Sequence, residues 1–252
     1  MTTDTYAVIG SLSPEREATA KRLAALETML SSLNVTVLTM RQYGQWTTPR
    51  GFPAVYNQLL NAAFADVACR FCWILGDDVR LPPEDFLHTM EVIRSDGTIG
   101  EAFPTELWRE NGALVTMLPF SGRKATYGEA AEFGEPLIEQ IFAGMAAAVI
   151  RREAWEAVRP IEAFGLGYSE DVDVSLRCWR AGFRVVNDRR AFFEHERGAT
   201  YNALVKEGVM DAQEPYRASA ALKKKWPFMW EESAEQIMER LRKWYQEALE
   251  HE

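Results

Sequence analysis

Two adjacent carboxylates follow an apolar stretch in the first half of the sequence. Asp77 and Asp78 come after residues 71–75 (FCWIL) and Gly76. Neighbouring carboxylates at a strand end are costly unless they are solvated, paired or bound to a cation. Their oxygens suit Mg²⁺ or Mn²⁺, and such an ion can bridge to the phosphate oxygens of a diphosphate. The alternative is a solvated turn that binds nothing.

A second acidic group opens a helix that we expect over residues 169–181. Ser169 is a favourable N-cap, and acidic residues such as Glu170 and Asp171 gain about 0.3–1 kcal/mol from the helix dipole. Helix capping alone can therefore account for both acids. The glycines in residues 164–168 (FGLGY) favour a second interpretation, because glycine lets the backbone approach a ligand closely.

His195 is the third candidate and one of only three histidines in the chain. It follows an expected aromatic strand and stands between Glu194 and Glu196. A lone histidine is a weak ligand signal. His195 therefore joins a metal site only if the fold brings it to Asp78.

Strands and helices are expected to alternate in the first half of the chain. The strands cover residues 6–12, 35–40 and 71–75, and the helices cover residues 14–33, 53–65 and 82–94. This alternation predicts an α/β fold with a mostly parallel central sheet flanked by helices. Residues 71–75 form a continuous apolar run, which predicts a strand buried on both faces. Ligands of such sheets bind at the carboxyl ends of the strands, where Asp77 and Asp78 stand.

The second half should contain further strands and helices around a polar segment. We expect a strand over residues 141–150, a helix over residues 152–158, and short strands over residues 183–186 and 191–193. The helix that begins near Ser169 should end before Gly182, a favourable residue just beyond a helix. Within this helix, Asp173 and Arg177 are spaced for an i, i+4 ion pair. Residues 121–135 are polar and are expected to form a mobile loop.

Composition places the chain among ordinary soluble globular proteins. It has 252 residues, of which 47% are hydrophobic and 26% are charged. That length suits an α/β domain at residues 1–200 followed by a helical extension at residues 201–252. No apolar run reaches the roughly 18 residues of a membrane span, and the N-terminus lacks a signal-peptide pattern, so we expect a cytoplasmic protein. Cys69 and Cys72 are expected to be buried thiols, because a zinc site needs four ligands.

The C-terminal segment mixes basic and aromatic residues. Residues 223–230 (KKKWPFMW) could contact an anionic acceptor, a membrane surface or nucleic acid, or could pack their aromatic rings on the core. The net charge of −9 disfavours binding along a nucleic-acid backbone, although a local basic patch is not excluded. The last helix carries an apolar stripe that should dock on the domain or on a second copy of the chain in a homo-oligomer. The stripe consists of Ile237, Leu241, Tyr245 and Leu249.

Several motifs occur in the order found in one enzyme family. They are residues 73–79 (WILGDDV), residues 143–152 (AGMAAAVIRR), residues 167–173 (GYSEDVD) with Arg177, residues 181–184 (AGFR), and His195 followed by Gly198. With these motifs the sequence resembles a family-2-type glycosyltransferase of the GT-A fold. The resemblance covers residues 6–200 and is strongest over residues 144–198.

The resemblance implies a metal site and a nucleotide site. Asp78 matches the last acid of the family's D-x-D motif and would bind Mn²⁺ or Mg²⁺, with His195 as the third anchor. Asp77 would position the nucleotide or the metal. Asn57 matches an asparagine near the nucleotide, and Gly144 would let its strand approach the donor sugar.

The resemblance also implies a reaction. Asp171 matches the general base that takes the acceptor proton, and Glu170 beside it would contact the acceptor or the donor sugar. The expected activity is transfer of a sugar from a nucleotide-diphosphate sugar to an acceptor hydroxyl, with inversion favoured. Two departures stand out. Gly76 replaces the first acid of the D-x-D motif, and no acid follows residues 35–40, which leaves the nucleotide base of the donor open.

Two other functions remain open at this point. A sugar-phosphate nucleotidyltransferase would normally carry a glycine-rich phosphate loop after the first strand, where this chain has only Gly10. A non-catalytic module that binds sugar or metal would not turn over a nucleotide sugar. The acceptor is equally open, and a lipid, a polysaccharide, a protein, a small molecule or a modified nucleic acid would each fit.

Overall fold

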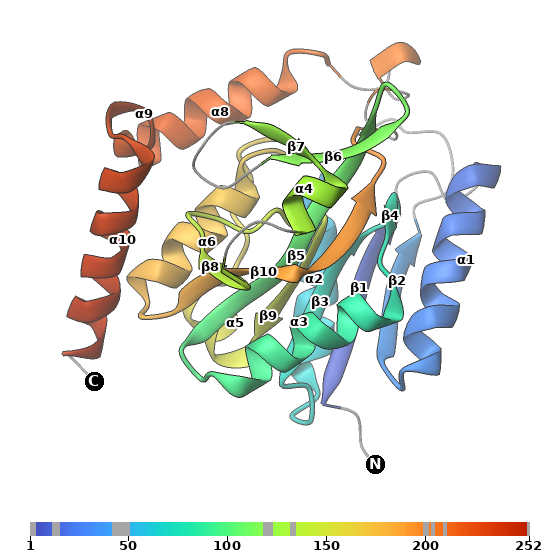
Figure 1. Cartoon of the computed structure of the whole chain (residues 1–252), viewed down its shortest axis with the longest axis horizontal. Helices are drawn as coiled ribbons and strands as arrows, with labels where there is room; N and C mark the ends of the chain where they lie inside the picture. Colours follow the sequence, from blue (N-terminus) through green and yellow to red (C-terminus); the bar gives the residue numbers. More distant parts are fainter. Residues whose placement is uncertain are drawn as a thin grey trace.

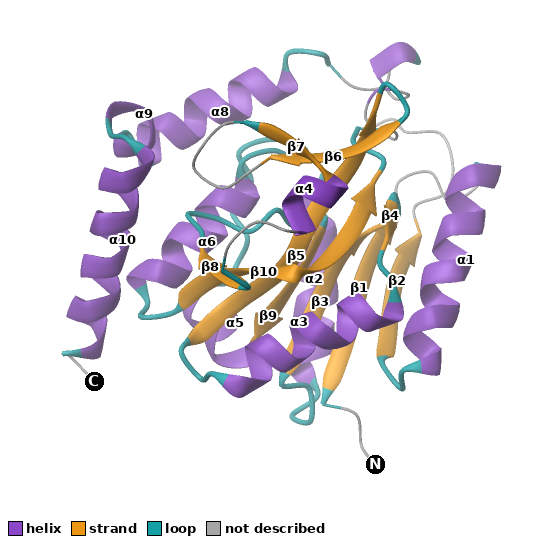
Figure 2. Cartoon of the chain, in the orientation of Figure 1, coloured by secondary structure: helices purple, strands orange, loops and turns teal. Residues whose placement is uncertain are grey.

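One β-sheet with helices on both faces forms the centre of the molecule (Figure 1, Figure 2). The computed structural model describes residues 4–11, 16–41, 51–117, 123–131, 135–198, 202, 205–208 and 211–250. The strands are β1 Thr5–Ser11, β2 Thr36–Arg41, β3 Phe71–Gly76, β4 Val79–Arg80, β5 Ile99–Glu110, β6 Ala113–Met117, β7 Lys124–Thr126, β8 Leu137–Glu139, β9 Ala147–Arg151 and β10 Arg184–His195. The helices are α1 Glu17–Ser32, α2 Phe52–Ala65, α3 Pro83–Ser95, α4 Tyr127–Ala131, α5 Arg152–Val158, α6 Glu170–Arg180, α8 Glu214–Lys225, α9 Phe228–Glu231 and α10 Ala234–Leu249.

The predicted architecture is confirmed. Seven strands lie in the order β2-β1-β3-β9-β5-β10-β4, and five of them point the same way. The two exceptions are β9, which pairs antiparallel with both β3 and β5, and β4, which pairs antiparallel with β10. The sequence pattern did not reveal this reversal, because a strand buried on both faces looks the same in either direction.

The continuous apolar run in β3 is buried on both faces, as predicted. Cys72 and Ile74 join a core cluster with α2, α5 and α6, whereas Trp73 and Leu75 join a second cluster with α1 and α3. Alternate residues of one strand therefore supply two cores, which is what a central strand between two helical layers requires. The expected buried state of the Cys69 and Cys72 thiols is also confirmed.

Several expected boundaries are wrong. The strand predicted over residues 141–150 begins only at Ala147, so Gly144 lies in the loop before β9. The short strands predicted over residues 183–186 and 191–193 are one strand, β10, whose pairing with β5 shifts between Asp188 and Phe192. The segment 121–135 contains β7 and α4 in its described part. The first two residues of the helix expected over residues 14–33 lie outside the described residues.

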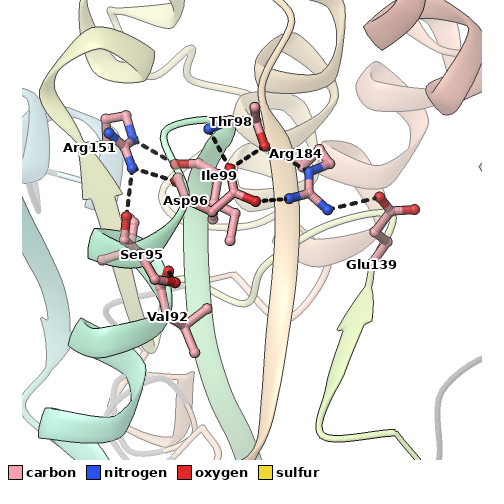
Figure 3. Close-up of polar contacts among 9 residues, drawn as sticks. Val92, Ser95, Asp96, Thr98, Ile99, Glu139, Arg151 and Arg184 are labelled. Carbon is pink, nitrogen blue, oxygen red and sulfur yellow. Dashed lines mark hydrogen bonds and ion pairs between the residues drawn. The ribbon is translucent and has the colours of Figure 1, made fainter.

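Arginine side chains hold the strand ends together at the end of the sheet where β5 and β10 begin (Figure 3). The buried Arg151 donates to the carbonyls of Ile93, Asp96 and Ile99 at 2.5–2.7 Å, where α3 ends and β5 begins. Arg184 at the start of β10 pairs with the Asp96 carboxylate and, at 3.4 Å, with Glu139 of β8. Charged donors satisfy several carbonyls at once here, which fixes β5, β9 and β10 relative to α3.

The C-terminal helices pack against α6 and share the core of the domain. α8 crosses one edge of the molecule and α10 runs down its side (Figure 1). Asp173 of α6 is fully buried and binds Arg177 at 2.9 Å, so the expected ion pair is confirmed. The same carboxylate accepts from the Trp226 indole at 2.8 Å and pairs with Lys225 at 2.7 Å. Packing on the core is confirmed for Trp226, Phe228 and Met229, whereas Trp230 is 43% exposed.

Three of the four residues in the apolar stripe of the last helix face the domain, whereas Leu249 is 44% exposed. Ile237 and Leu241 are buried in the cluster that contains α6, and Tyr245 meets Trp179 edge to face with ring centroids 6.5 Å apart. Within the described part of the chain, every helix is too short or too polar to span a membrane.

Trp226→Phe tests whether the Asp173 carboxylate holds the C-terminal helices. The substitution removes a hydrogen bond to a buried charged acceptor, and we expect it to lower the free energy of unfolding by about 1.5–3 kcal/mol in urea denaturation. Trp230→Phe is the control, because Trp230 is 43% exposed, and it should change stability by no more than about 0.5 kcal/mol. Equal effects of the two substitutions would contradict this role of Asp173.

Candidate active site

A cavity of about 580 Å³ opens at the carboxyl ends of β1 and β3. This is the place where open α/β sheets bind ligands. Six of the seven site residues expected from the sequence line it together. They are Asp77, Asp78, Gly144, Glu170, Asp171 and His195.

The seventh expected residue, Asn57, is not among the lining residues of this cavity. Its carboxamide accepts from the Ile161 backbone N–H at 2.8 Å and donates to the Ile161 carbonyl at 2.9 Å. Asn57 therefore fastens α2 to the segment that follows α5. The nucleotide contact expected of it remains a prediction from the family resemblance.

Strand pairing brings His195 to Asp78. The two-residue strand β4 begins directly after Asp77 and Asp78 and pairs with the end of β10, with His195 opposite Val79. The Glu196 N–H also donates to the Asp78 carbonyl at 3.0 Å. As a result His195 Nε2 lies 3.4 Å from an Asp78 carboxylate oxygen.

Glu106 completes this group, and the sequence analysis missed it. It lies on β5, whose parallel pairing with β10 places Glu106 opposite Phe193. His195 Nδ1 lies 2.6 Å from a Glu106 oxygen, and Arg197 binds the same carboxylate through two nitrogens at 2.7 and 2.6 Å. Glu106 lies in β5, where the sequence around it contains no recognisable motif. Its contact with His195 becomes visible only from the register of β5 and β10.

The electrostatics of this group follow from its partners. Burial alone would lower the pKa of His195, but the Asp78 and Glu106 carboxylates outweigh it and raise that pKa to about 9. Burial would raise the pKa of Glu106, but Arg197 and His195 hold it at about 2. Both groups are therefore charged near neutral pH in the absence of a cation.

Gly76 lets the Asp78 carboxylate fold back over the end of β3. A Cβ atom at position 76 would lie 2.7 Å from an Asp78 oxygen, so an acid there would compete with Asp78 for the same space. This explains in physical terms why glycine occupies the place of the first acid. The neighbouring Asp77 is buried and accepts a 2.5 Å hydrogen bond from the Ser11 hydroxyl at the end of β1. Burial raises the pKa of Asp77 to about 6, against the effect of Ser11.

Glu170 and Asp171 form a second acidic group in the lining of the cavity. Burial and the neighbouring Asp171 raise the pKa of Glu170 to about 8, and one of its oxygens has no partner within the described residues. Burial raises the pKa of the half-buried Asp171 to about 6, although the Val172 N–H donates to its carboxylate at 2.8 Å. Near neutral pH the pair therefore combines a protonated Glu170 with an ionised Asp171.

The loop before these acids is held from two sides. The Ser169 hydroxyl does not cap α6, contrary to expectation, because Ser169 adopts a left-handed conformation with φ of 72°. Leu166 binds Glu214 of α8 through its N–H at 2.7 Å and Phe52 of α2 through its carbonyl at 2.6 Å. Gly165 makes room for Glu214, since a Cβ there would lie 2.2 Å from the carboxylate. Of the two glycines expected to approach a ligand, Gly167 lines the cavity and Gly165 does not.

A buried hydrogen-bond chain holds the loop that contains Gly144. The Ser175 hydroxyl on α6 donates to Glu101 of β5 at 2.6 Å and accepts from the Ala143 N–H at 3.1 Å. A Cβ at Gly144 would meet nothing within 4 Å, so space for a ligand remains beside this backbone. The helix that carries the acidic pair thus also positions the loop that faces it.

Asp78 and His195 fit a divalent cation as two protein ligands. No group of three or more His, Cys, Asp or Glu residues with metal-site geometry occurs within the described ranges. Cations such as Mg²⁺ commonly take one or two protein ligands and complete their shell with substrate phosphates and water. Glu106 on Nδ1 leaves Nε2 of His195 facing Asp78, which is how second-shell carboxylates orient metal-binding histidines.

Comparisons with known proteins found similarity to solved structures but not to family models or curated sequences. No protein-family model matches the sequence, and no curated protein matches it at a significant level. The chain is similar to GalNAc-T7 crystallised with UDP, GalNAc and Mn²⁺, with 12% identity, a TM-score of 0.48 and coverage of 76% of this chain. It spans only 43% of that GalNAc-T7 chain.

Two further solved structures show a comparable likeness. One is the catalytic domain of Drosophila β1,4-galactosyltransferase 7 with xylobiose, at 13% identity and a TM-score of 0.49 over 79% of this chain and 73% of that one. The other is A197 from STIV, at 15% identity and a TM-score of 0.48 over 77% of this chain and 85% of that one. These likenesses concern the backbone, and the function is argued below from the residues of the site.

Glu106→Gln tests the arrangement around His195. In metal-free protein with EDTA, NMR titration of the His195 ring should give a pKa of about 9. The substitution removes one of the two carboxylates that raise this pKa, so it should fall by an easily measured amount. Glu110→Gln is the control on the same strand, since Glu110 pairs with Lys124. An unchanged His195 titration in the Glu106 variant would contradict the contact.

Proposed function

We propose that this protein is a metal-dependent glycosyltransferase that transfers a sugar from a nucleotide-diphosphate sugar to an acceptor hydroxyl. One observation supports this above the others. The fold brings Asp78 and His195, which could hold a cation, into a single cavity with the neighbouring acids Glu170 and Asp171. At about 580 Å³, the cavity lies within the usual range for ligands of this size.

Asp171 is proposed as the general base. It is ionised near neutral pH, it lines the cavity, and the first turn of α6 fixes its backbone. It would accept the proton of the acceptor hydroxyl as that oxygen attacks the anomeric carbon and the bond to the diphosphate breaks. A base placed for direct attack favours inversion of configuration.

Glu170 is proposed to hold a substrate hydroxyl. Its unpartnered oxygen is buried beside Asp171, and the protonated form can donate a hydrogen bond that an ionised carboxylate cannot. Because the two neighbouring acids titrate apart, one can act as a donor while the other acts as a base.

Asp78 and His195 would hold Mn²⁺ or Mg²⁺, with Asp77 positioning the nucleotide end of the donor. When bound, the cation neutralises negative charge on the leaving diphosphate. Gly10 and Gly76, near the ends of β1 and β3, line the same cavity, and a Cβ there would press on Tyr56 or Asp78. Tyr56 supports both strand ends, because its hydroxyl accepts from the Gly10 N–H at 3.0 Å and donates to the Leu75 carbonyl at 2.7 Å.

The two alternative functions fit these observations less well. Nucleotidyl transfer has no use for a general base held beside a protonated acid in the cavity that contains the proposed cation ligands. A binding module would not require two neighbouring acids, Glu170 and Asp171, whose burial makes their ionised forms unfavourable.

A ligand screen tests the class of donor. With Mn²⁺ present, a nucleotide-diphosphate sugar should raise the melting temperature by mass action, equivalent to about 2.7 kcal/mol at a hundredfold excess over Kd. Asp78→Asn should abolish the Mn²⁺-dependent part of this shift. Asp66→Asn, which changes an exposed acid between α2 and β3, should leave it intact. Stabilisation that is the same with and without Asp78 would argue against the cation site.

The pH dependence of turnover tests the acid–base pair. With the donor identified by the screen, kcat/KM should be greatest between about pH 6 and 8, the pKa values of Asp171 and Glu170. Below that range Asp171 gains a proton and loses its function as a base, and above it Glu170 loses its donor proton.

Two isosteric variants separate these roles. Asp171→Asn should lower kcat by about 10²–10⁴-fold while donor binding is kept. Glu170→Gln, which retains a donor, should keep activity near neutral pH and lose the alkaline limb of the profile. Full activity of Asp171→Asn would show that another group is the base.

A further inference from the structure

A second cavity of about 460 Å³ adjoins the first at its metal end. Asp78, His195 and Arg197 line both cavities, so a ligand in one lies beside a ligand in the other. The remaining residues line the second cavity but not the first. They are Arg22, Arg80, Trp108, Arg109, Glu194 and Glu196.

Four arginines line this cavity, although the protein as a whole has a net charge of −9. We call this space the arginine cavity. Its lining contains three carboxylates, Asp78, Glu194 and Glu196, one of which is also a proposed cation ligand. Four arginines against three carboxylates leave an excess of positive charge in this lining before His195 or a cation is counted.

The arginines differ in how firmly they are held. Arg197 lies over the Trp108 ring at 3.7 Å and binds Glu106 with two of its five N–H donors, which leaves donors for a ligand. Arg22 is largely buried and pairs with Glu196. Arg109 is mostly exposed and makes a long 3.3 Å contact with Glu194. The Arg80 backbone pairs with β10, but its guanidinium forms no hydrogen bond or ion pair within the described residues.

We propose that the arginine cavity binds a phosphate group of the acceptor, so that the acceptor is a small phosphorylated molecule. This proposal rests on the proposed function and names its second substrate. Arginine presents a planar set of N–H donors that matches phosphate oxygens. The Arg197 guanidinium is already held in place by the Trp108 ring and the Glu106 carboxylate. The first cavity has room for a nucleotide-diphosphate sugar by itself, so the donor does not need this second space.

The charge of the whole chain narrows the class of acceptor. A grip on a nucleic-acid backbone depends on positive charge spread over many phosphates, whereas the basic residues here surround one cavity. A phosphate monoester or a short phosphodiester therefore fits the arginine cavity better than a polymer does.

Inorganic pyrophosphate is the probe for this site. Calorimetric titration into metal-free protein with EDTA excludes binding through the cation site. The wild type should bind pyrophosphate, and Arg80→Gln with Arg109→Gln should weaken binding at least about tenfold by removing charge-assisted hydrogen bonds. Lys21→Gln with Lys243→Gln is the charge-matched control, since both lysines are 75% exposed outside the arginine cavity. Equal weakening in both double variants, or no binding by the wild type, would overturn the proposal.

A second arm separates acceptor phosphate from donor phosphate. With Mn²⁺, the Arg80 and Arg109 double variant should still show the wild-type thermal shift with the nucleotide-diphosphate sugar. Loss of that shift would assign the arginines to the donor and overturn the acceptor proposal. An oligonucleotide that competes with pyrophosphate better than a small phosphate ester does would overturn the choice of a small acceptor.

The two proposals can fail separately. If no nucleotide sugar stabilises the protein, the glycosyltransferase proposal fails, while pyrophosphate binding by metal-free protein still reports on the arginine cavity. If the donor binds and pyrophosphate does not, only the acceptor proposal fails.

Discussion

Five carboxylates converge on one cavity, and the rest of the structure must accommodate their mutual repulsion. They are Asp77, Asp78, Glu106, Glu170 and Asp171. Like charges in a partly buried space raise one another's pKa values and destabilise the fold unless they are paired, protonated or bound to a cation. The structure contains the first two of these solutions, ion pairing and protonation, at different residues of the cavity. The proposed function adds the third, a cation bound by Asp78 and His195.

Pairing stabilises the acids around His195, and protonation stabilises Glu170. His195 and Arg197 neutralise Glu106, and His195 also contacts Asp78. Within the described residues Glu170 forms no ion pair, and burial together with Asp171 raises its pKa to about 8. Removing either arrangement would leave a buried charge without compensation. The same electrostatic constraint therefore gives the two groups of acids different charge states, which the proposed cation site and the proposed acid–base pair both require.

The secondary structure holds these groups at the required positions. The β4–β10 pairing sets Asp78 beside His195, and the β5–β10 register sets Glu106 behind it. The helical extension helps to position Glu170 and Asp171. Asp173 anchors α8 to α6, and Glu214 holds the loop before Glu170. Residues 211–250 are thus part of the framework of the site, and we propose that they fold with residues 1–200 as one unit.

The sequence predicted what depends on local pattern and missed what depends on register. The apolar run of β3, the helix before Gly182 and the Asp173–Arg177 pair each follow from spacing along one element, and the structure contains them. The resemblance to a glycosyltransferase family brought together residues that line one cavity. Glu106, Arg197 and the arginine cavity depend on which strands are neighbours, and the antiparallel β9 that reorders the sheet has no local signature. The Ser169 cap was wrong because a left-handed backbone turns the side chain away from the helix end.

Anomalous diffraction from crystals grown with Mn²⁺ and a nucleoside diphosphate tests the central claim most directly. The account predicts one manganese peak in the cavity, bound by the Asp78 carboxylate, by Nε2 of His195 and by diphosphate oxygens. A peak at Glu170 and Asp171, or a nucleotide bound in the cavity with no manganese beside Asp78, would contradict it.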